Sequence, residues 1–462
     1  MKARKLLCGL LTIVMLIAIF AGCNSGSSET SGSSAAEPSS EASQEASGET
    51  SEETPSEAVV IPYMQNNAGN DANYELYSGQ IEQFNEKYAG QYVIETDWLE
   101  GGSDVLREKL KVLGSSGVLP AVIQDLHTEP DFRDLLIKNG RLADLKSAID
   151  SDADWRAMFT DDNYNRAIVD GSIYVEPAYY SQYVGIFYNK EHFEAAGVAD
   201  YPLSWDLDMF WEACEKIQAA GFDPIANYVA EQGWGYTLFQ TAVMGATEEG
   251  QEFMWTSMPS DYTVDVFKKS LEVLKKSYDY STSDALSIGY TEAASYFYGE
   301  TASMFFNGPW MIESLFDTSF CAEGFADKIG YAPFPEMGMI DNTGGAGSFA
   351  VTTDHSEEVQ AGAIEFLKFL ATPEQLQAGA VKIGNASPLV PLTEEQLSSL
   401  SLPMQEYFNA VERCEYTVPS YQGMWPASIQ HTVLNNYSAE FAGGKISVDE
   451  YAQLFQDYAS EE

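Results

Sequence analysis

The sequence predicts an α/β protein of two domains, and three observations lead to this class. Strand-like and helix-like segments alternate through the first half of the folded part, as in proteins with a mainly parallel sheet. Hydrophobic residues make up 45% of the chain and aromatic residues 13%, so large cores can form. The length of 462 residues favours two domains once an N-terminal polar segment is set aside.

The alternation begins where the polar segment ends. Residues 58–65 (AVVIPYMQ) are β-branched and apolar, as is typical of a buried strand, and residues 74–90 form an amphipathic helix. In that helix Ile81, Phe84 and Tyr88 recur at helical spacing. The pattern continues with strands expected at 91–99 and 120–126, helices at 104–117 and 129–145, two strands running into a helix over 171–198, and helices at 204–221 and 263–278.

The N-terminus carries a basic stretch and then an apolar one. Lys2, Arg4 and Lys5 precede an apolar run that ends at Phe20 and is short for a helix that spans a bilayer. The sequence Ala-Gly-Cys closes the run at Cys23, and the whole segment resembles a bacterial lipoprotein signal peptide.

This resemblance implies that residues 1–22 are removed and that the Cys23 thiol receives a diacylglycerol. The protein would then be extracytoplasmic and anchored to the cell membrane by lipidated Cys23. Phe20 departs from the pattern, because leucine is usual at that position. A plain signal peptide or a short membrane anchor is the alternative.

Residues 23–58 comprise this cysteine and an expected tether. From Asn24 to Glu57 the chain consists almost wholly of Ser, Gly, Ala, Thr, Pro and Glu, without an aromatic or large aliphatic residue. Such a segment cannot bury enough apolar surface to offset its ordering entropy, so we expect disorder. A flexible coil of this length spans about 30 Å, root mean square.

The charge balance excludes one class of partner. The chain has 70 acidic and 24 basic residues and a formal net charge of −46, so nucleic-acid binding, which needs Lys and Arg at phosphates, is not expected. After maturation only Cys214, Cys321 and Cys414 remain besides Cys23, and three scattered thiols make no disulfide framework. The four histidines are far apart, without metal-ligand spacing, so no metal or cofactor is expected.

One acidic run has aspartates at the spacing of a calcium-binding loop. Asp150, Asp152, Asp154 and Asp161 fall at positions 1, 3, 5 and 12 of an EF-hand loop. Trp155 occupies the position where the sharp turn requires Gly, and the last acid is not the usual bidentate Glu. A solvated acidic run that starts a helix is therefore the favoured interpretation.

Five blocks in the rest of the chain resemble one family in order and spacing. The family is the extracellular solute-binding proteins of carbohydrate ABC importers, the group that includes maltose-binding protein. Pro120-Ala121-Val122 departs from it, because Pro-Asp-Val is common there. The blocks are YVEPAYYSQYVGIFYNKEHFEAAGV, SWDLDMFWEACEKIQAAG, GETASMFFNGPWMI, IGYAPFP and SVDEYAQLFQD.

The resemblance implies a periplasmic-binding-protein-like fold, in which two α/β lobes are joined by a hinge and the ligand lies in the cleft between them. By that pattern lobe 1 holds residues 59–170 and 333–386, and lobe 2 holds residues 171–332 and 387–462. It further implies a monomer that binds a carbohydrate and docks on the membrane permease subunits of an ABC transporter.

A sugar site needs aromatic rings against C–H surfaces and polar groups for the hydroxyls. Trp310 is the first candidate, because it follows the turn Asn307-Gly308-Pro309 and corresponds to a tryptophan that stacks on the ligand in maltose-binding protein. The alternative is a core tryptophan. The resemblance adds Trp425 and Glu231 at ligand-binding positions of the same relative.

The residues themselves suggest further candidates. Trp234 lies between two glycines, which favours an exposed ring on a loop, and Asp125 follows an expected strand. Tyr179 and Tyr180 follow a proline at the expected hinge, and one of them should point into the cleft. By contrast, two tryptophans at helical spacing, Trp205 and Trp211, are expected in the core, with Ser204 as the N-cap of their helix.

The leading hypothesis is a non-enzymatic receptor that delivers a sugar or oligosaccharide to an ABC permease. A secreted glycoside hydrolase is a second hypothesis, since an acidic chain offers many carboxylates, although the sequence identifies no catalytic pair. The third keeps the fold and binds a cation such as a polyamine, because acids and aromatic rings also suit cations.

Overall fold

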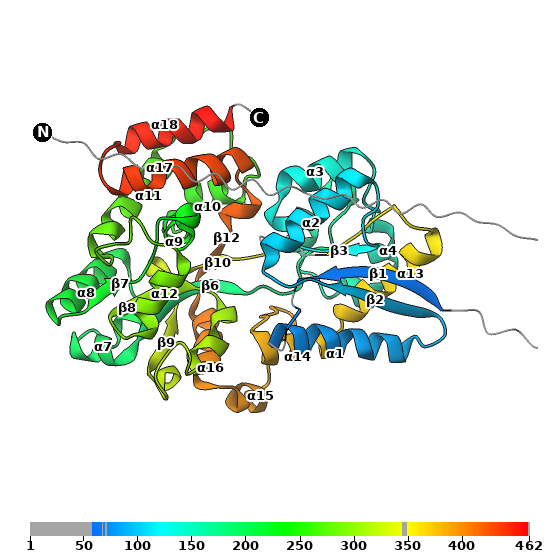
Figure 1. Ribbon diagram of the computed structural model, residues 1–462, viewed down its shortest axis with the longest axis horizontal. Helices are drawn as coiled ribbons and strands as arrows, with labels where there is room; N and C mark the ends of the chain where they lie inside the picture. The colour runs from blue at the N-terminus through cyan, green and yellow to red at the C-terminus, as the bar shows by residue number, and fades with distance from the viewer. Residues whose placement is uncertain (1–57, 67, 70–71, 344–348, 461–462) are drawn as a thin grey trace, which may run out of the picture. The chain divides into compact units, whose positions relative to one another are not determined.

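Two large β-sheets organise the part of the chain that the structure describes (Figure 1). The computed structural model describes residues 58–460 except 67, 70–71 and 344–348. The expected signal peptide, Cys23 and nearly all of the tether lie outside the described residues. Within the described range, no helix combines the length and the apolar character that a membrane span requires.

The first lobe is built on a four-stranded sheet in the order β11-β3-β1-β2. Its three N-terminal strands are parallel, as the alternating pattern predicts, and the late strand β11 pairs antiparallel with β3. The strands are β1 (Val59–Gln65), β2 (Tyr92–Trp98), β3 (Val122–Ile123) and β11 (Ala350–Val351), beside a small hairpin of β4 (Ile168–Val169) and β5 (Ser172–Ile173). The helices are α1 (Ala72–Lys87), α2 (Ser103–Ser116), α3 (Pro130–Lys138), α4 (Lys146–Ser151), α5 (Ala153–Arg156), α6 (Asp161–Arg166), α13 (Glu357–Leu370) and α14 (Pro373–Ile383).

The alternation of side chains along β1 explains the layers of this lobe. Ile61 and Tyr63 point to one face and pack against α1 and α13 through Phe84 and Phe366. Met64 points to the other face and packs with residues of α2 and α3. Both faces of the sheet are therefore covered by helices, as expected for parallel strands.

The second lobe is built on a mixed sheet in the order β12-β10-β6-β8-β7, with β9 also paired to β6. Most of its helices lie between β6 and β10 in the chain, as the helix-rich sequence of that region predicts. The strands are β6 (Tyr183–Asn189), β7 (Asp223–Ile225), β8 (Ala302–Asn307), β9 (Ile329–Ala332), β10 (Gly338–Asp341) and β12 (Tyr416–Pro419). The helices are α7 (Lys190–Ala195), α8 (Leu207–Ala219), α9 (Trp234–Met244), α10 (Glu248–Trp255), α11 (Asp265–Ser277), α12 (Tyr290–Tyr298), α15 (Glu394–Ser399), α16 (Leu402–Arg413), α17 (Leu434–Ala442) and α18 (Val448–Ala459).

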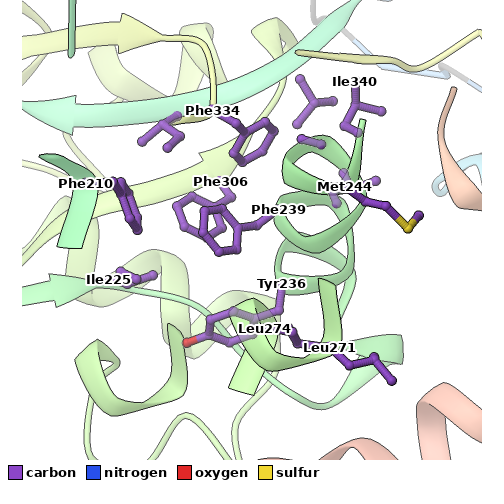
Figure 2. Close-up of a cluster of buried hydrophobic side chains, with 14 of the residues drawn as sticks. Phe210, Ile225, Tyr236, Phe239, Met244, Leu271, Leu274, Phe306, Phe334 and Ile340 are labelled. Carbon is purple, nitrogen blue, oxygen red and sulfur yellow. The ribbon is translucent and has the colours of Figure 1, made fainter. Parts of the chain in front are cut away.

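The core of this lobe centres on α9, which is buried on nearly all sides. Figure 2 shows Phe239 of α9 beside Phe306 of β8, and their rings stack with centroids 5.3 Å apart. Trp205 and Trp211 belong to the same cluster, so their predicted core role is confirmed. The N-cap of α8 is Asp206 rather than Ser204, because its side chain accepts from the Met209 amide at 2.8 Å.

The chain crosses between the lobes at three adjacent places. Ser181 and Ala386 exchange two backbone hydrogen bonds of 2.9 Å, and the Ser181 hydroxyl donates to Asp341 Oδ1 at 2.5 Å. The same oxygen accepts from the backbone amide and hydroxyl of Thr343. The three crossing segments are thus joined by hydrogen bonds and form the hinge region.

The crossings differ from the lobe boundaries that the resemblance implies. Residues 171–179 belong to the first lobe, because Ile173 and Tyr179 are in its core with Phe349. Residues 333–341 belong to the second lobe, because β10 pairs with β6 and β12. The expected boundaries at 170 and 332 are therefore wrong by about ten residues, since strand pairing continues past them.

Asp150 and Asp152 of the expected helix-starting run have partners within the protein. Asp152 caps α5 and accepts from the Trp155 amide at 3.1 Å. Asp150 contacts Lys146 and accepts from the Tyr164 hydroxyl. Among the described residues, no group of three or more His, Cys, Asp or Glu is placed to hold a metal ion.

Candidate interlobe ligand site

A cavity of about 520 Å³ lies between the two lobes, next to the hinge region. Polar side chains from the carboxyl ends of β1 and β3 face it, where open crevices form in parallel sheets. Its described lining consists of Asn66, Asn73, Tyr77, Gly102, Ser103, Arg107, Gln124, Asp125, His127, Thr128, Tyr180, Gln182, Trp234, Trp310, Asn342, Thr343, Phe349, Asn385 and Gln422.

A buried amide network holds the first-lobe wall. The Tyr63 hydroxyl donates to Gln124 Oε1 at 2.8 Å, and the Gln124 amide donates to Gln65 Oε1 at 2.6 Å. The same oxygen of Gln65 accepts from the Asn66 backbone amide at 2.8 Å. Burial raises the pKa of the Tyr63 hydroxyl well above its usual value, so it stays a neutral donor. The strand ends therefore present Asn66 and Gln124 in fixed positions.

Three polar atoms on the cavity wall are buried without a hydrogen-bond partner among the described residues. They are Asp125 Oδ2, His127 Nδ1 and Asn385 Oδ1. His127 is 9% exposed and Asn385 is 5% exposed. Burial lowers the pKa of the His127 imidazole, although the nearby Asp125 carboxylate opposes this shift. A buried polar atom of this kind is costly unless a ligand or water completes its hydrogen bonds, so these atoms are suited to ligand contacts.

Asp125 has an unusual backbone conformation at this wall. Its φ of 64° lies in the left-handed region, which is costly for a residue other than Gly. The conformation ends β3 and starts the short 3-10 turn η1 (Leu126–Thr128). Strain at a cavity wall is common at functional sites, because the surrounding structure must hold it.

Two tryptophans of the second lobe form an aromatic wall. Trp310 lies in the first turn of η5 (Pro309–Phe316), and Trp234 begins α9. Their ring centroids are 6.0 Å apart and their planes are inclined by 56°. A side chain at Gly308 would collide with the Trp310 ring, so this glycine is needed for the ring position. The Trp234 indole N–H donates to Gln422 Oε1 at 3.0 Å, which fixes its orientation.

A second cavity of about 630 Å³ adjoins the first. Arg107, Thr128, Trp234 and Gln422 line both, so Trp234 stands at their shared wall. The basic groups here are neutralised, because Arg107 and Lys111 form ion pairs with Glu129 at 3.3 and 3.1 Å. The other described lining residues are Asp104, Glu108, Tyr228, Glu231, Gln232, Gln430, His431 and Asn435.

The lobes touch directly beside these cavities. Gly423 ends the 3-10 turn η8 (Tyr421–Gly423), and a Cβ there would stand 2.6 Å from the His127 carbonyl oxygen. Nearby, the Ala427 amide donates to Asp131 at 3.3 Å. Only a residue without a side chain permits this approach of the two backbones.

Comparison with known proteins identifies the family to which the chain belongs. A model described as bacterial extracellular solute-binding protein matches residues 68–377, which is more than half of the chain. The chain belongs to this family. Its members are non-catalytic binding proteins, so the protein binds a solute and is not an enzyme. A search of curated protein sequences found no match.

Solved structures similar to this solute-binding protein share its fold. A chitin oligosaccharide binding protein is 20% identical, with a TM-score of 0.70 over 87% of this chain and 98% of its own. A Streptococcus pneumoniae solute-binding protein in complex with the blood group A-trisaccharide is 20% identical, with a TM-score of 0.69 over 87% and 100%. A probable secreted solute-binding lipoprotein from Streptomyces coelicolor is 15% identical, with a TM-score of 0.64 over 87% and 99%.

The first cavity of this solute-binding protein brings together four of the candidate residues. Trp310, Trp234, Asp125 and Tyr180 all line it, from both lobes and the hinge region. Trp234 is half-buried at a helix start rather than on an open loop. Glu231 lines only the second cavity. Whether these residues contact the solute stays a prediction.

Two candidates lie elsewhere. Trp425 is 0% exposed in the core of the second lobe, so the expectation that it faces the cleft is wrong. The rings of Tyr262, Phe267 and Phe455 surround it with centroids 5.6 to 5.9 Å away, because α11 and α18 fold over this segment. Tyr179 is 4% exposed in the first-lobe core, and Tyr180 is the member of the pair that faces the cleft.

Most of the polar lining was missed by sequence reasoning. Two signals were present: Asn66 and Gln124 follow strands β1 and β3 directly, as Asp125 does. Asn385 and Gln422 follow no such pattern, because Asn385 lies at the crossing beside Ala386 and Gln422 lies in the short turn η8 after β12. The remaining missed polar lining residues are Asn73, Tyr77, Ser103, Arg107, His127, Thr128, Gln182, Asn342 and Thr343.

Proposed function

We propose that this protein captures a sugar or oligosaccharide outside the membrane and delivers it to the permease of an ABC importer. The observation that carries the proposal is the cavity in which Trp234 and Trp310 face Asp125 and the amides of Asn66 and Gln124. Indole rings cover the C–H faces of a sugar, and amide and carboxylate groups bond its hydroxyls. The structural relatives whose names mention a chitin oligosaccharide and a trisaccharide support the same class of ligand.

A polyamine fits this cavity less well. Asp125 is the one carboxylate among the described residues of its lining, and Arg107 and His127 stand on the same wall. A linear cation with several charges needs several unpaired acids to balance it. Neutral hydroxyls avoid this cost.

A thermal-shift screen tests the ligand class. Ligand that binds the folded state raises the unfolding midpoint in a concentration-dependent way. We expect at least one sugar from a panel of mono- and oligosaccharides to raise it, and spermidine to have no effect. A shift with spermidine and none with sugars would replace the proposal by the cationic alternative.

Transport requires that the lobes respond to the ligand. The site is shared between two lobes joined by a hinge region, so a ligand that contacts both stabilises the closed arrangement. We propose that the permease distinguishes this arrangement from the empty one.

We further propose that the protein is lipidated at Cys23 and held at the cell membrane. The basic and apolar N-terminal segment that ends at this cysteine supports the proposal, together with the extracellular character of the family. We expect labelled diacylglycerol to be incorporated into the wild type and not into Cys23→Ser, with sugar affinity unchanged in the variant. Lack of incorporation in the wild type would refute lipidation.

A further inference from the structure

A third cavity, of about 420 Å³, also lies between the lobes. It adjoins the first cavity, since His127, Asn342 and Thr343 line both. Residues of α3, α6 and the segment 167–175 form its first-lobe side, and residues of α10, η8 and the positions that follow them form its second-lobe side. Its volume lies in the range of small-molecule sites.

Apolar side chains line much of the third cavity, whereas amides and tryptophans line the first. Ile137 and Val169 come from the first lobe, and Trp255 and Met424 come from the second. Val169 is 40% exposed and the other three are half-buried, so apolar surface is accessible here from both lobes. A ligand with an apolar body gains free energy by covering such surface.

Two arginines give this cavity a positive character that is unusual in the chain. Arg133 and Arg166 line it with a single acid, Asp134, among the described lining residues, although acids outnumber basic residues by 70 to 24 in the whole sequence. Each arginine donates through Nε to a carboxylate, Arg133 to Asp134 at 2.9 Å and Arg166 to Asp162 at 2.8 Å. Among the described residues neither donates a hydrogen bond from its terminal nitrogens, so these donors stay open to a carboxylate or sulfonate.

A cation–π contact between the lobes orients one of these arginines. Arg166, the last residue of α6, has its Cζ atom 3.8 Å from the ring centroid of Trp255, the last residue of α10. The side chains of Arg133 and Arg166 are only 19% and 34% exposed, so salt screens their attraction for an anion less than it screens a free surface charge. Both guanidinium groups therefore stand partly buried beside apolar surface.

We propose that the third cavity is a second ligand site, which takes a small organic anion with an apolar ring body. The arginines Arg133 and Arg166 hold the anionic group, and the body covers Ile137, Val169 and Met424. A sugar suits this space less well, because its hydroxyls would meet aliphatic side chains that offer no hydrogen bonds. The lining comes from both lobes, so an occupant favours the arrangement in which the lobes lie this close.

The test is titration of the full protein with two fluorescent probes. One is 1-anilinonaphthalene-8-sulfonate, an aromatic anion, and the other is N-phenyl-1-naphthylamine, which has the same rings without the charge. We expect the sulfonate to saturate a single site. Arg133→Gln and Arg166→Gln should each weaken its binding about fivefold, as expected for a partly exposed ion pair, and weaken binding of the neutral probe by less than about twofold.

Two further variants locate the site. Arg156→Gln is the matched control, because Arg156 also pairs with an acid, Asp161, and stacks on a ring, that of Tyr164, but does not line the cavity. It should leave binding of both probes unchanged. Met424→Ala should weaken both probes to the same degree, since it shortens the apolar wall and leaves the charges in place.

Three results would overturn the second site. They are no binding of the sulfonate, binding of many molecules without saturation, and equal effects of Arg156→Gln and Arg166→Gln. Urea midpoints equal to that of the wild type show that the variants are folded. None of these measurements needs a sugar, so they decide the second site whether or not the proposed function holds.

Discussion

The two walls of the interlobe cavity differ in chemistry. Both tryptophans of the lining, Trp234 and Trp310, come from the second lobe, and each stands in the first turn of a helical segment. The charged side chains of the described lining, Arg107 and Asp125, come from the first lobe. The first lobe thus supplies directional polar contacts, and the second supplies apolar surface.

This difference teaches how a hinged site divides recognition. Polar groups at strand ends are fixed by the sheet itself, as the network around Gln124 illustrates. Large rings are instead positioned by neighbouring glycines and by single hydrogen bonds such as Trp234 to Gln422. The proposed sugar ligand needs both kinds of contact, so we expect only the closed arrangement of the lobes to complete the site.

The largest expected effect is a loss of stability, and it distinguishes the core tryptophan Trp425 from the cavity-facing tryptophans of the second lobe. Trp425→Ala should lower the free energy of unfolding by about 3–5 kcal/mol, because it removes a completely buried ring from the core. The affinity of the remaining folded protein should not change. A urea titration and a sugar titration on one preparation measure both quantities. Weakened sugar binding with the urea midpoint of the wild type would show that Trp425 belongs to the ligand site.

Trp310→Ala should show the opposite pattern. Loss of a cavity-facing ring should weaken sugar binding by about 1–3 kcal/mol, or roughly five- to 150-fold. The urea midpoint should fall less than in Trp425→Ala, because Trp310 is only half-buried. If the sugar affinity of Trp310→Ala is unchanged while its urea midpoint falls, Trp310 is a core residue and the second lobe does not supply the apolar wall through it.

Gly423→Ala tests whether the two walls must approach each other. The added Cβ meets the His127 carbonyl, and Gly423 does not occupy the left-handed region, so the strain is confined to the contact between lobes. We expect about tenfold weaker binding, or about 1.4 kcal/mol, because the closed arrangement becomes less populated. Gly79→Ala in α1 is the control, since its Cβ meets no atom within 4 Å. Equal affinities of the two variants would contradict a role of this contact in closure.

The smallest effect concerns pH and the first-lobe wall. Burial lowers the pKa of His127 below its usual 6.5, with Asp125 and Asp341 opposing and Arg107 and Arg133 reinforcing the shift. The native state therefore binds fewer protons than the unfolded state below about pH 6.5, and its stability falls as the pH falls.

His127→Gln removes this contribution. Without ligand, its free energy of unfolding should decline less steeply between about pH 6.5 and 5 than that of the wild type, by at most about 1.4 kcal/mol per pH unit. Urea unfolding at several pH values measures the slopes. Parallel slopes would show that His127 is not held neutral by burial.

Local patterns in the sequence predicted much of the fold. The strand and helix periods of residues 58–138 and 171–198 correspond to β1 through α3 and to β5, β6 and α7, whereas the bounds of α4, α5, α6 and β4 were not predicted. Asp125 was found because it follows a strand. Trp310 and Trp425 could not be separated in this way, since both are tryptophans beside a proline. Only Trp425 is fully buried, because helices α11 and α18 pack over it, and this packing is a property of the assembled lobe.

The three crossings at the hinge region also govern how the chain can fold. β11 completes the first sheet by pairing with β3, although more than two hundred residues separate them in the chain. β12, near the C-terminus, completes the second sheet beside β10. An N-terminal fragment emerging from a ribosome lacks β11 until residue 351 and β12 until residue 419, so neither lobe can finish folding early. Such distant pairings slow folding, and a slowly folding chain stays extended long enough to be threaded through an export channel.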